Sequence, residues 1–354
     1  MAAPQPSLEP LREQVSLATS FAWLVVSAVS ATVFREKGEH ALNEVWRTLM
    51  TAEQSSRFRQ ALVKLGIDGD PPAVAAAKYH YFSNTIGGLS MHFVQESDRK
   101  AWIRYLPPWG SFPGISALAM PPSLRRTILS TWHPRNGELL GCPRLRWVVT
   151  KFVSEGHPYD EGYFEEVDHD LKPGERMKVE PVAQSPAFDP ATAPRLDPQA
   201  WPEARLLKGH RNYAADYALH TLQAVVSLFG EQAAVNIVGA AMRFMAVQYM
   251  GQLTRQTGCV DGTVQSAAGC AAAILRSFGN DVEFSRRSAT VVELAFKDFA
   301  PFDAVATPAL RAALFGFFEM GTSVVSGRFT ATRAFDGAAG VETWCFQDHQ
   351  RWMQ

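Results

Sequence analysis

Two stretches of the chain about 190 residues apart follow the same order of residue types, and this internal repeat constrains the fold more than any other feature. Residues 75–109 and 271–302 each contain three alanines, an aromatic residue, an asparagine, a strand-like run, a second aromatic residue and a proline–aromatic pair. The aligned members are Phe82 and Phe278, Asn84 and Asn280, Trp102 and Phe296, and Pro108–Trp109 and Pro301–Phe302. Such a repeat predicts one fold made twice.

The similarity continues beyond both ends of the aligned stretches. Upstream, the Val-Val-Ser triplet at 25–27 recurs at 225–227, and downstream Arg125 corresponds to Arg311. We therefore expect two tandem repeats. The predicted ranges are 1–11 for a flexible lead-in, 12–170 for the first repeat, 171–203 for a proline-rich linker and 204–354 for the second repeat.

Bulk properties agree with a globular protein of two domains. A chain of 354 residues, 47% of them hydrophobic, can bury two cores of about 150 residues each. A net charge of −1 offers no basic surface for nucleic acid. The four cysteines are scattered and show no metal-ligand spacing, which is typical of reduced cysteines in an intracellular protein. We expect no metal site.

One apolar run, residues 21–34, is the only membrane candidate in the sequence. It is shorter than the roughly 20 residues that span a bilayer, and it lacks the basic flank of a signal peptide. We predict a buried core helix here, and a cytoplasmic protein that does not interact with membranes.

Apolar periodicity predicts three helices at the start of each repeat, over residues 11–34, 40–65 and 72–82, and again over 203–229, 231–257 and 262–278. Each set precedes strands (89–96 and 101–106; 288–296), a further helix starting at Ser123 or Pro308, and a final hairpin (145–152 with 163–167; 328–346). This order favours an α+β fold, in which each of two tandem copies packs a helical layer on a small antiparallel sheet.

Residues 173–202 contain seven prolines and little apolar periodicity. We interpret this segment as an interdomain linker. A stretch of some thirty residues without regular structure is unusual unless it packs on a surface. We therefore expect it to lie across both repeats.

The turn of the final hairpin differs between the two copies. In the second copy, residues 335–340 do little more than turn the chain. In the first copy, residues 156–166 contain one histidine, two tyrosines, one aspartate and three glutamates. Because a turn alone does not require so many titratable groups, the first copy is predicted to be specialised. The alternative is a solvated acidic hairpin.

Alternation along the strand after this turn places Glu161 and Tyr163 on the same face. We hypothesise that His157 or Glu161 acts as a general base, that Asp160 orients His157, and that Tyr163 donates a hydrogen bond to developing negative charge. His80 sits among aromatic residues and is interpreted as a core histidine.

A basic stripe opens the second copy. On a helix, Arg205, Lys208 and Asn212 lie along one face, and Arg211 lies beside it. In one interpretation, Arg205 and Arg211 hold a substrate carboxylate, because guanidinium groups bind carboxylates through two hydrogen bonds. In the other, the stripe pairs with the acidic hairpin and joins the two halves. Trp102 and Trp132 complete the predicted substrate-binding set.

Two segments carry a family resemblance. The helix 310–320 leads into Gly327-Arg328-Phe329, and the closing strand 342–346 combines an acid, a cysteine and an aromatic residue. This pattern resembles 4-vinyl reductase domains, haem-NO-binding sensors and the small subunits of vesicle-tethering transport particles. It is also similar to the 2-amino-thiazoline-4-carboxylate hydrolase group of bacterial proteins. The resemblance implies an α+β domain that binds small ligands. It assigns no catalytic residue, and the axial histidine and Tyr-x-Ser-x-Arg string of the haem-binding members are not evident.

These features together predict an enzyme, without a cofactor, that hydrolyses or opens a small cyclic substrate bearing a carboxylate. The expected partner is a small organic acid, and a homodimer is left open. Two alternatives also remain open: a non-catalytic sensor or carrier of a small ligand, and a structural or assembly subunit.

Overall fold

The computed structural model describes residues 7–108, 120–181, 184–305 and 307–353. Contacts divide the chain into a central unit, residues 37–213, and a terminal unit, residues 1–36 and 214–354. The first boundary falls close to Gly38, whose φ of 84° interrupts the long helix α1 (Glu9–Leu65). The second falls inside α5 (Glu203–Phe229). The compact units therefore differ in extent from the predicted repeats, since the opening helix of the first repeat packs with elements of the second.

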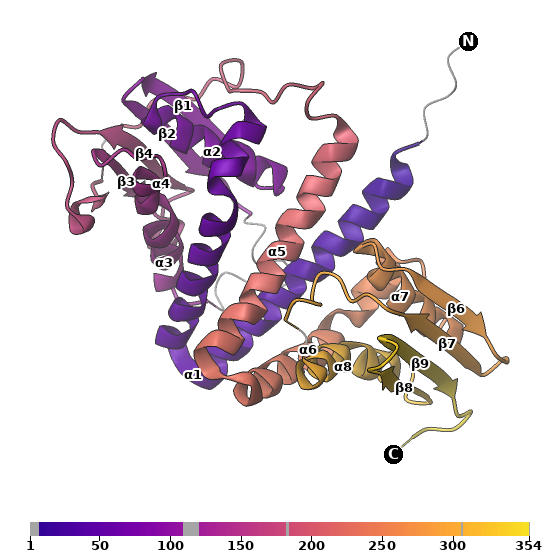
Figure 1. The fold of residues 1–354 in the computed structure, drawn as a ribbon. Helices are drawn as coiled ribbons and strands as arrows, with labels where there is room; N and C mark the ends of the chain where they lie inside the picture. The colour runs from indigo at the N-terminus through magenta and orange to yellow at the C-terminus, as the bar shows by residue number, and fades with distance from the viewer. Residues whose placement is uncertain (1–6, 109–119, 182–183, 306, 354) are drawn as a thin grey trace, which may run out of the picture. The chain divides into compact units, whose positions relative to one another are not determined.

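The central unit combines helices with a five-stranded sheet (Figure 1). Its helices are residues 37–65 of α1, α2 (Pro72–Ile86), α3 (Ser123–Trp132), α4 (Asn136–Leu139) and the start of α5. Its strands are β1 (Met91–Ser97), β2 (Lys100–Tyr105), β3 (Leu145–Lys151), β4 (Asp160–Glu166) and β5 (Met177–Val179). The strand order is β1-β2-β4-β3-β5, and only β5 pairs in parallel, with β3. Helix α2 packs against β1, β2 and β4.

Side-chain alternation gives this sheet two different faces. Phe164 and Trp147 belong to the main core, which the sheet shares with α2. Tyr163 and Trp102 lie on the opposite face, called here the outer face, in a smaller apolar cluster. The predicted separation of Tyr163 from Phe164 is therefore confirmed, because neighbouring residues of a strand point to opposite sides.

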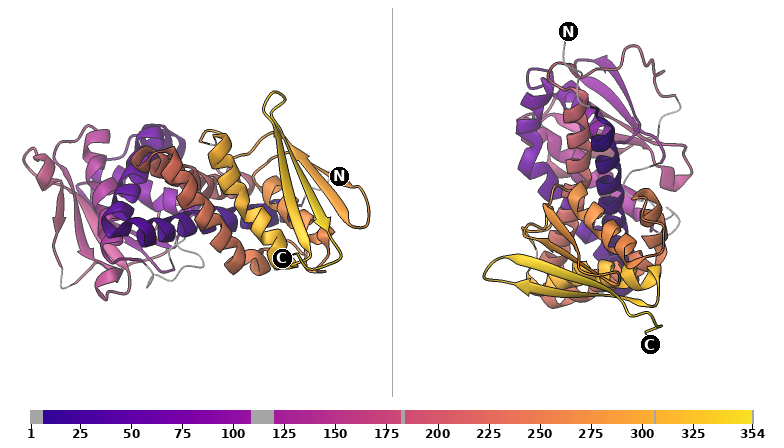
Figure 2. Two further views of the ribbon diagram at one scale, coloured as in Figure 1. Left: turned by 90° about the horizontal axis from the view of Figure 1, so that it is seen from below. Right: turned by 90° about the vertical axis from the view of Figure 1, so that its right-hand side faces the viewer.

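The terminal unit contains residues 9–36 of α1, the rest of α5, and three further helices: α6 (Glu231–Gln256), α7 (Val264–Ser277) and α8 (Pro308–Val325). Its strands are β6 (Val282–Arg286), β7 (Val291–Phe296), β8 (Phe329–Asp336) and β9 (Val341–Asp348). They form an antiparallel sheet in the order β6-β7-β9-β8 and stand beside the helices of their own unit (Figure 2). Strand β6 was not predicted, because its Glu283-Phe284-Ser285-Arg286 sequence is mostly polar and exposed.

The two units repeat one arrangement: helix, hairpin, helix, hairpin, with sheet order first-second-fourth-third. The α+β class is confirmed. In each unit, an arginine of the helix between the hairpins bonds a fully buried carboxylate near the start of a strand. Arg125 Nε donates to Asp160 Oδ2 at 2.9 Å, and Arg311 Nε donates to Glu342 Oε2 at 2.8 Å. These are the two arginines that the sequence alignment matched. Origin by tandem duplication remains a prediction.

The apolar run at residues 21–34 lies within α1. The part of α1 from Glu9 to Ser55 is the one helix among the described residues that is long and apolar enough to span a membrane, and 78% of its most apolar window is buried. The Phe21 ring packs edge-on against Phe317 at 5.2 Å within the terminal unit. This burial agrees with the predicted core helix.

Two expectations fall partly on residues outside those described. The lead-in was predicted over residues 1–11, but α1 already begins at Glu9, and residues 1–6 are not described. Trp109, which the alignment pairs with Phe302, also lies outside the described residues.

The proline-rich segment packs along the central unit. Strand β5 extends the sheet beside β3, and Ser185 and Pro186 contact the outer face. Farther along, Trp201 Nε1 donates to the carbonyl oxygen of Lys64 at 3.2 Å. The linker therefore packs on the surface of the central unit, and its predicted position across both repeats remains a prediction.

Close packing around Gly162 of β4 generates the first testable prediction. A Cβ atom at Gly162 would lie 2.4 Å from the carbonyl oxygen of Val148 and 2.5 Å from the buried Trp147 ring. Gly162→Ala should therefore lower the free energy of unfolding by about 1–3 kcal/mol, measured as a lower urea midpoint. Gly174→Ala is the matched control, because its Cβ would meet nothing within 4 Å. Equal midpoints for the two variants would contradict this packing.

Candidate functional site

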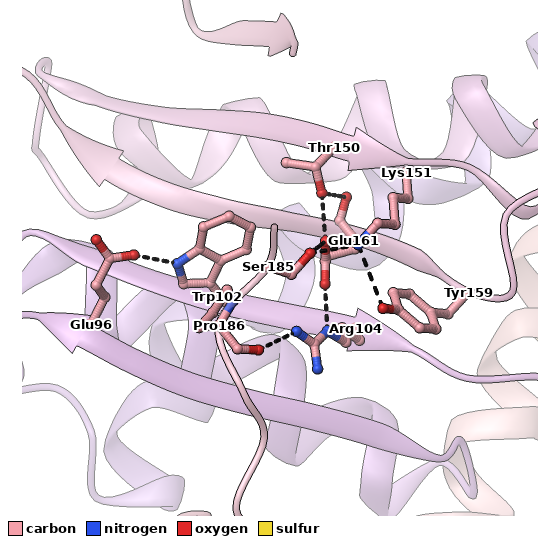
Figure 3. A network of polar contacts seen from close by, with 9 residues as sticks. All are labelled: Glu96, Trp102, Arg104, Thr150, Lys151, Tyr159, Glu161, Ser185 and Pro186. Carbon is pink, nitrogen blue, oxygen red and sulfur yellow. Dashed lines mark hydrogen bonds and ion pairs between the residues drawn. The ribbon is translucent and has the colours of Figure 1, made fainter. Parts of the chain in front are cut away.

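Glu161, one of the predicted catalytic residues, lies at the centre of a polar cluster on the outer face of the central sheet (Figure 3). Its Oε1 accepts hydrogen bonds from Thr150 Oγ1 at 2.9 Å, Lys151 Nζ at 2.8 Å and Ser185 Oγ at 2.5 Å. Its Oε2 accepts a hydrogen bond from Arg104 Nε. We call these five residues the Glu161 cluster. The Glu161 side chain is 0% exposed, so these four donors replace the water that a carboxylate would otherwise bind.

This environment favours a structural role for Glu161. Burial raises its pKa, but hydrogen bonds from Lys151, Ser185, Arg104 and Thr150 outweigh burial and leave the pKa of Glu161 below its usual value. The side chain is therefore an anion at neutral pH. A general base must reach the proton that it removes, whereas this carboxylate is enclosed by donors.

Asp160 and His157 do not form the predicted pair. Asp160 accepts hydrogen bonds at 2.9 Å from Arg125 Nε and from the backbone N–H of Val153. His157 lies in the turn before β4, with Nδ1 3.1 Å from the carbonyl oxygen of Phe152. Asp160 therefore orients Arg125 instead of His157. The reason is that β2 pairs with β4 as far as Asp160, which places this residue in the strand and not in the turn.

The predicted aromatic residues are also separated. Tyr163 packs against Trp102 on the outer face at 4.4 Å, with Lys100 Nζ 4.5 Å above the Tyr163 ring. Burial raises the pKa of Tyr163 to about 12, so its hydroxyl stays protonated. Trp132 instead ends α3 and packs edge-on against His80 at 5.7 Å. Trp102 and Trp132 thus belong to different clusters and do not line one pocket.

The basic stripe lies at the start of α5, within the central unit. Arg205 stacks on Trp201 at 3.9 Å and donates to a backbone carbonyl at 2.5 Å. Lys208 and Asn212 are exposed, and Arg211 Nε donates to Asn212 Oδ1 at 3.4 Å. Among the described residues, the ion pairs of the acidic hairpin are with other cations: Asp160 with Arg125, Glu161 with Arg104 and Lys151, Glu165 with Arg146, and Glu166 with Arg144. The structure therefore does not bring the stripe and the hairpin together.

A second polar cluster, the histidine chain, crosses the core of the central unit. Gln54 Nε2 donates to Asn136 Oδ1 at 2.9 Å, and Asn136 Nδ2 lies 2.7 Å from His80 Nε2. The Tyr105 hydroxyl lies 3.4 Å from His80 Nδ1 and 2.9 Å from His133 Nε2, and His133 Nδ1 lies 3.2 Å from a carbonyl of α3. These contacts are all satisfied when both histidines carry their proton on Nδ1 and Tyr105 donates to His133.

Both histidines of this chain are neutral. Burial lowers the pKa of His80 to about 3, and burial together with the adjacent His80 lowers the pKa of His133 well below its usual value. Their rings stack at 4.1 Å. The interpretation of His80 as a core histidine is confirmed. Sequence analysis did not identify its partners, since they come from three other segments of the chain.

The α2–α5 groove is a third feature of the central unit, and it is open to solvent. It has a volume of about 490 Å³ and lies between the end of α2, the linker and the first turns of α5. Most of its lining is aromatic or aliphatic. The lining residues are Tyr81, Phe82, Thr85, Ile86, Pro194, Arg195, Leu196, Pro198, Trp201, Glu203, Leu206, Leu207 and His210. Sequence reasoning missed it, because the linker residues carry no periodic signal.

A few polar groups lie among these apolar side chains. Burial lowers the pKa of His210, so its imidazole is neutral at pH 7. The imidazole fits against Gly88, where a Cβ would lie 2.7 Å from Nε2. Burial raises the pKa of Tyr81, and the nearby Arg195 opposes this shift. Arg195 itself is exposed and makes no ion pair with a described residue, so its guanidinium is available to a ligand.

Metal binding has no candidate in the part of the chain that the structure describes, where no three His, Cys, Asp or Glu side chains could hold an ion together.

None of the ten predicted site residues lines the groove. Arg205 stacks on the lining residue Trp201.

Replacing the central carboxylate tests the structural role of the Glu161 cluster. Glu161→Gln leaves two buried cations facing a neutral amide, so we expect the free energy of unfolding to fall by about 3–5 kcal/mol. The measurement is urea denaturation followed by circular dichroism. Glu155→Gln is the control, because its ion pair with Arg126 is on the surface. A Glu161→Gln protein of wild-type stability would contradict this role and would leave the catalytic hypothesis the stronger one.

The histidine chain predicts a loss of stability in mild acid. Histidine in the unfolded chain titrates near 6.5, whereas folded His80 titrates at about 3. As pH falls below 6.5, the unfolded state therefore binds protons that the folded state excludes, and stability decreases until about pH 3. Melting temperatures between pH 6.5 and 5 should fall less steeply in His80→Gln than in the wild type. The exposed-residue control, His169→Gln, should keep the wild-type slope. Identical slopes in His80→Gln and the wild type would show that His80 does not resist protonation.

Comparisons with family models, with curated proteins and with solved structures found no match. The resemblance to 4-vinyl reductase-like domains therefore remains a prediction.

Proposed function

We propose that the protein is a non-catalytic carrier or sensor that binds a small, largely apolar organic acid in the α2–α5 groove. The observation that carries this proposal is the groove itself. Its volume of about 490 Å³ lies within the range of small-molecule sites, and its lining is mostly apolar with a few polar groups.

The polar groups suit recognition of a carboxylate. Arg195 supplies a cation at the side of Tyr81, and a guanidinium can bind a carboxylate through two hydrogen bonds. Phe82, Ile86 and Leu207 offer apolar contacts for the body of the ligand. A hydrogen bond to a charged group contributes about 1.5–3 kcal/mol, which is enough to discriminate an acid from its amide.

Binding is favoured over acid–base turnover by the location of the titratable groups. The four residues hypothesised to be catalytic lie outside the groove, and the contacts of Glu161 and Asp160 are with protein donors. Within the groove, His210 is neutral and Tyr81 is protonated, which suits hydrogen bonding to a ligand.

Calorimetric titration with phenylacetate and its neutral isostere phenylacetamide tests the proposal. Arg195→Gln should weaken phenylacetate binding at least about tenfold, which corresponds to 1.4 kcal/mol, and leave phenylacetamide unaffected. Leu207→Trp should weaken binding of both by narrowing the groove. Arg99→Gln is the matched control, since Arg99 is an exposed arginine of the same unit that pairs with Asp168.

Two results would overturn the proposal. One is equal affinity of Arg195→Gln and Arg99→Gln for phenylacetate. The other is unchanged binding in Leu207→Trp, which would place the ligand elsewhere. Mass spectrometry of the incubated ligand separates binding from turnover, because a carrier returns it unaltered.

A further inference from the structure

We propose that the outer face of the central sheet is a binding surface for an extended, acidic peptide segment of the pattern Ser-Pro-x-aromatic. Residues 184–188 of the chain, Gln-Ser-Pro-Ala-Phe, occupy this surface as an intramolecular ligand. We call these residues the strap. The partner is a protein that presents the same pattern and displaces the strap.

The first two contacts of the strap are polar and specific. The Ser185 hydroxyl accepts a hydrogen bond from Lys151 Nζ at 2.5 Å and donates one to Glu161 Oε1 at 2.5 Å (Figure 3). The carbonyl oxygen of Pro186 accepts a hydrogen bond from the Arg104 guanidinium at 2.6 Å. The site thus recognises a hydroxyl both as a hydrogen-bond donor and as an acceptor. It also donates a hydrogen bond to the carbonyl of the following residue.

The third contact is aromatic. The Phe188 ring stacks on His92 of β1 with centroids 3.7 Å apart and planes 6° apart. Burial, and secondarily the charge of Arg104, lowers the pKa of His92, so the stacked imidazole is neutral. Together with the hydroxyl and the carbonyl, the ring completes a three-point recognition of Ser-Pro-x-Phe.

The strap is held differently from the strand that precedes it. Strand β5 joins the sheet by backbone pairing with β3, which any sequence can supply. Residues 184–188 have no regular secondary structure, and their contacts to the sheet use two side chains and one carbonyl. Recognition therefore depends on residue type, as it does when an extended peptide is bound by pockets for particular side chains.

Charge favours an acidic partner. In the Glu161 cluster, Arg104 and Lys151 face a single carboxylate, and both cations are largely buried. Ser185 and Pro186 contribute only neutral oxygens, so the Glu161 cluster keeps one excess positive charge. A segment that carries net negative charge would bind it more strongly than the strap does.

The sheet of the terminal unit lacks this surface. Its β9 residue Thr343 pairs with Ala295 of β7, at the register position where Glu161 pairs with Arg104 in the central sheet. The Glu161–Arg104 pair of the central sheet thus has no counterpart at this position of the terminal sheet, which agrees with the specialisation predicted from the hairpin of the first copy.

The experiment removes contacts of the strap in the full-length protein and adds the strap sequence as a separate peptide. The double variant Ser185→Gly, Phe188→Gly removes two of the three contacts. A fluorescent peptide acetyl-Gln-Ser-Pro-Ala-Phe-Asp-amide should bind this variant at least tenfold more tightly than the wild type, measured by fluorescence anisotropy. A peptide of the same composition in scrambled order should bind neither protein. Adding Lys151→Met to the double variant should weaken peptide binding, because Lys151 Nζ no longer donates to the serine hydroxyl of the peptide.

Circular dichroism first establishes that the double variant is folded. If it is not, Phe188→Gly alone takes its place, because Ser185 then still bonds Glu161. A folded variant that fails to bind the peptide, or that binds the scrambled peptide equally well, would show that the strap is internal packing and would overturn the proposal. Phenylacetate titration of the same variant reports separately on the α2–α5 groove.

Discussion

A buried arginine–carboxylate pair joins helix to sheet in each unit, and the rest of the architecture depends on it. Arg125 bonds Asp160 in the central unit, and Arg311 bonds Glu342 in the terminal unit. The desolvation cost of burying two charges cancels much of the free energy of their electrostatic attraction. Removing one partner, however, leaves an uncompensated charge in the core. The pair therefore acts mainly by orientation, since other placements of the helix on the sheet would break this buried hydrogen bond between helix and strand.

The position of Asp160 also determines the chemistry of the opposite face. Because consecutive strand residues alternate, anchoring Asp160 beneath the sheet turns Glu161 to the outer side, where Arg104 and Lys151 surround it. The linker then completes the cluster through Ser185. One short acidic sequence thus serves two purposes: its first carboxylate holds a helix, and its second holds the strap.

Hydrogen-bonding partners within the protein distinguish the Glu161 cluster and the histidine chain from the α2–α5 groove. The Glu161 carboxylate and the imidazoles of His80 and His133 have hydrogen-bond partners within the protein, as buried polar groups require. In the α2–α5 groove, by contrast, an apolar lining surrounds a volume of about 490 Å³ and Arg195 is exposed. Density of titratable residues along the sequence therefore does not by itself mark a pocket, because folding can use such residues to neutralise one another.

The sequence by itself determined the α+β class, the repeated order of helices and hairpins, and the match of Arg125 with Arg311, because these depend on local periodicity and on comparison of the two halves. It also separated Tyr163 from Phe164, since alternation is a property of any strand. Only the tertiary structure decided that residues 9–36 of α1 pack with the terminal unit, that Asp160 bonds Arg125 instead of His157, and that the linker forms one wall of a groove. These features join residues far apart in the chain, and the free energy of such contacts depends on burial and register that no local pattern records.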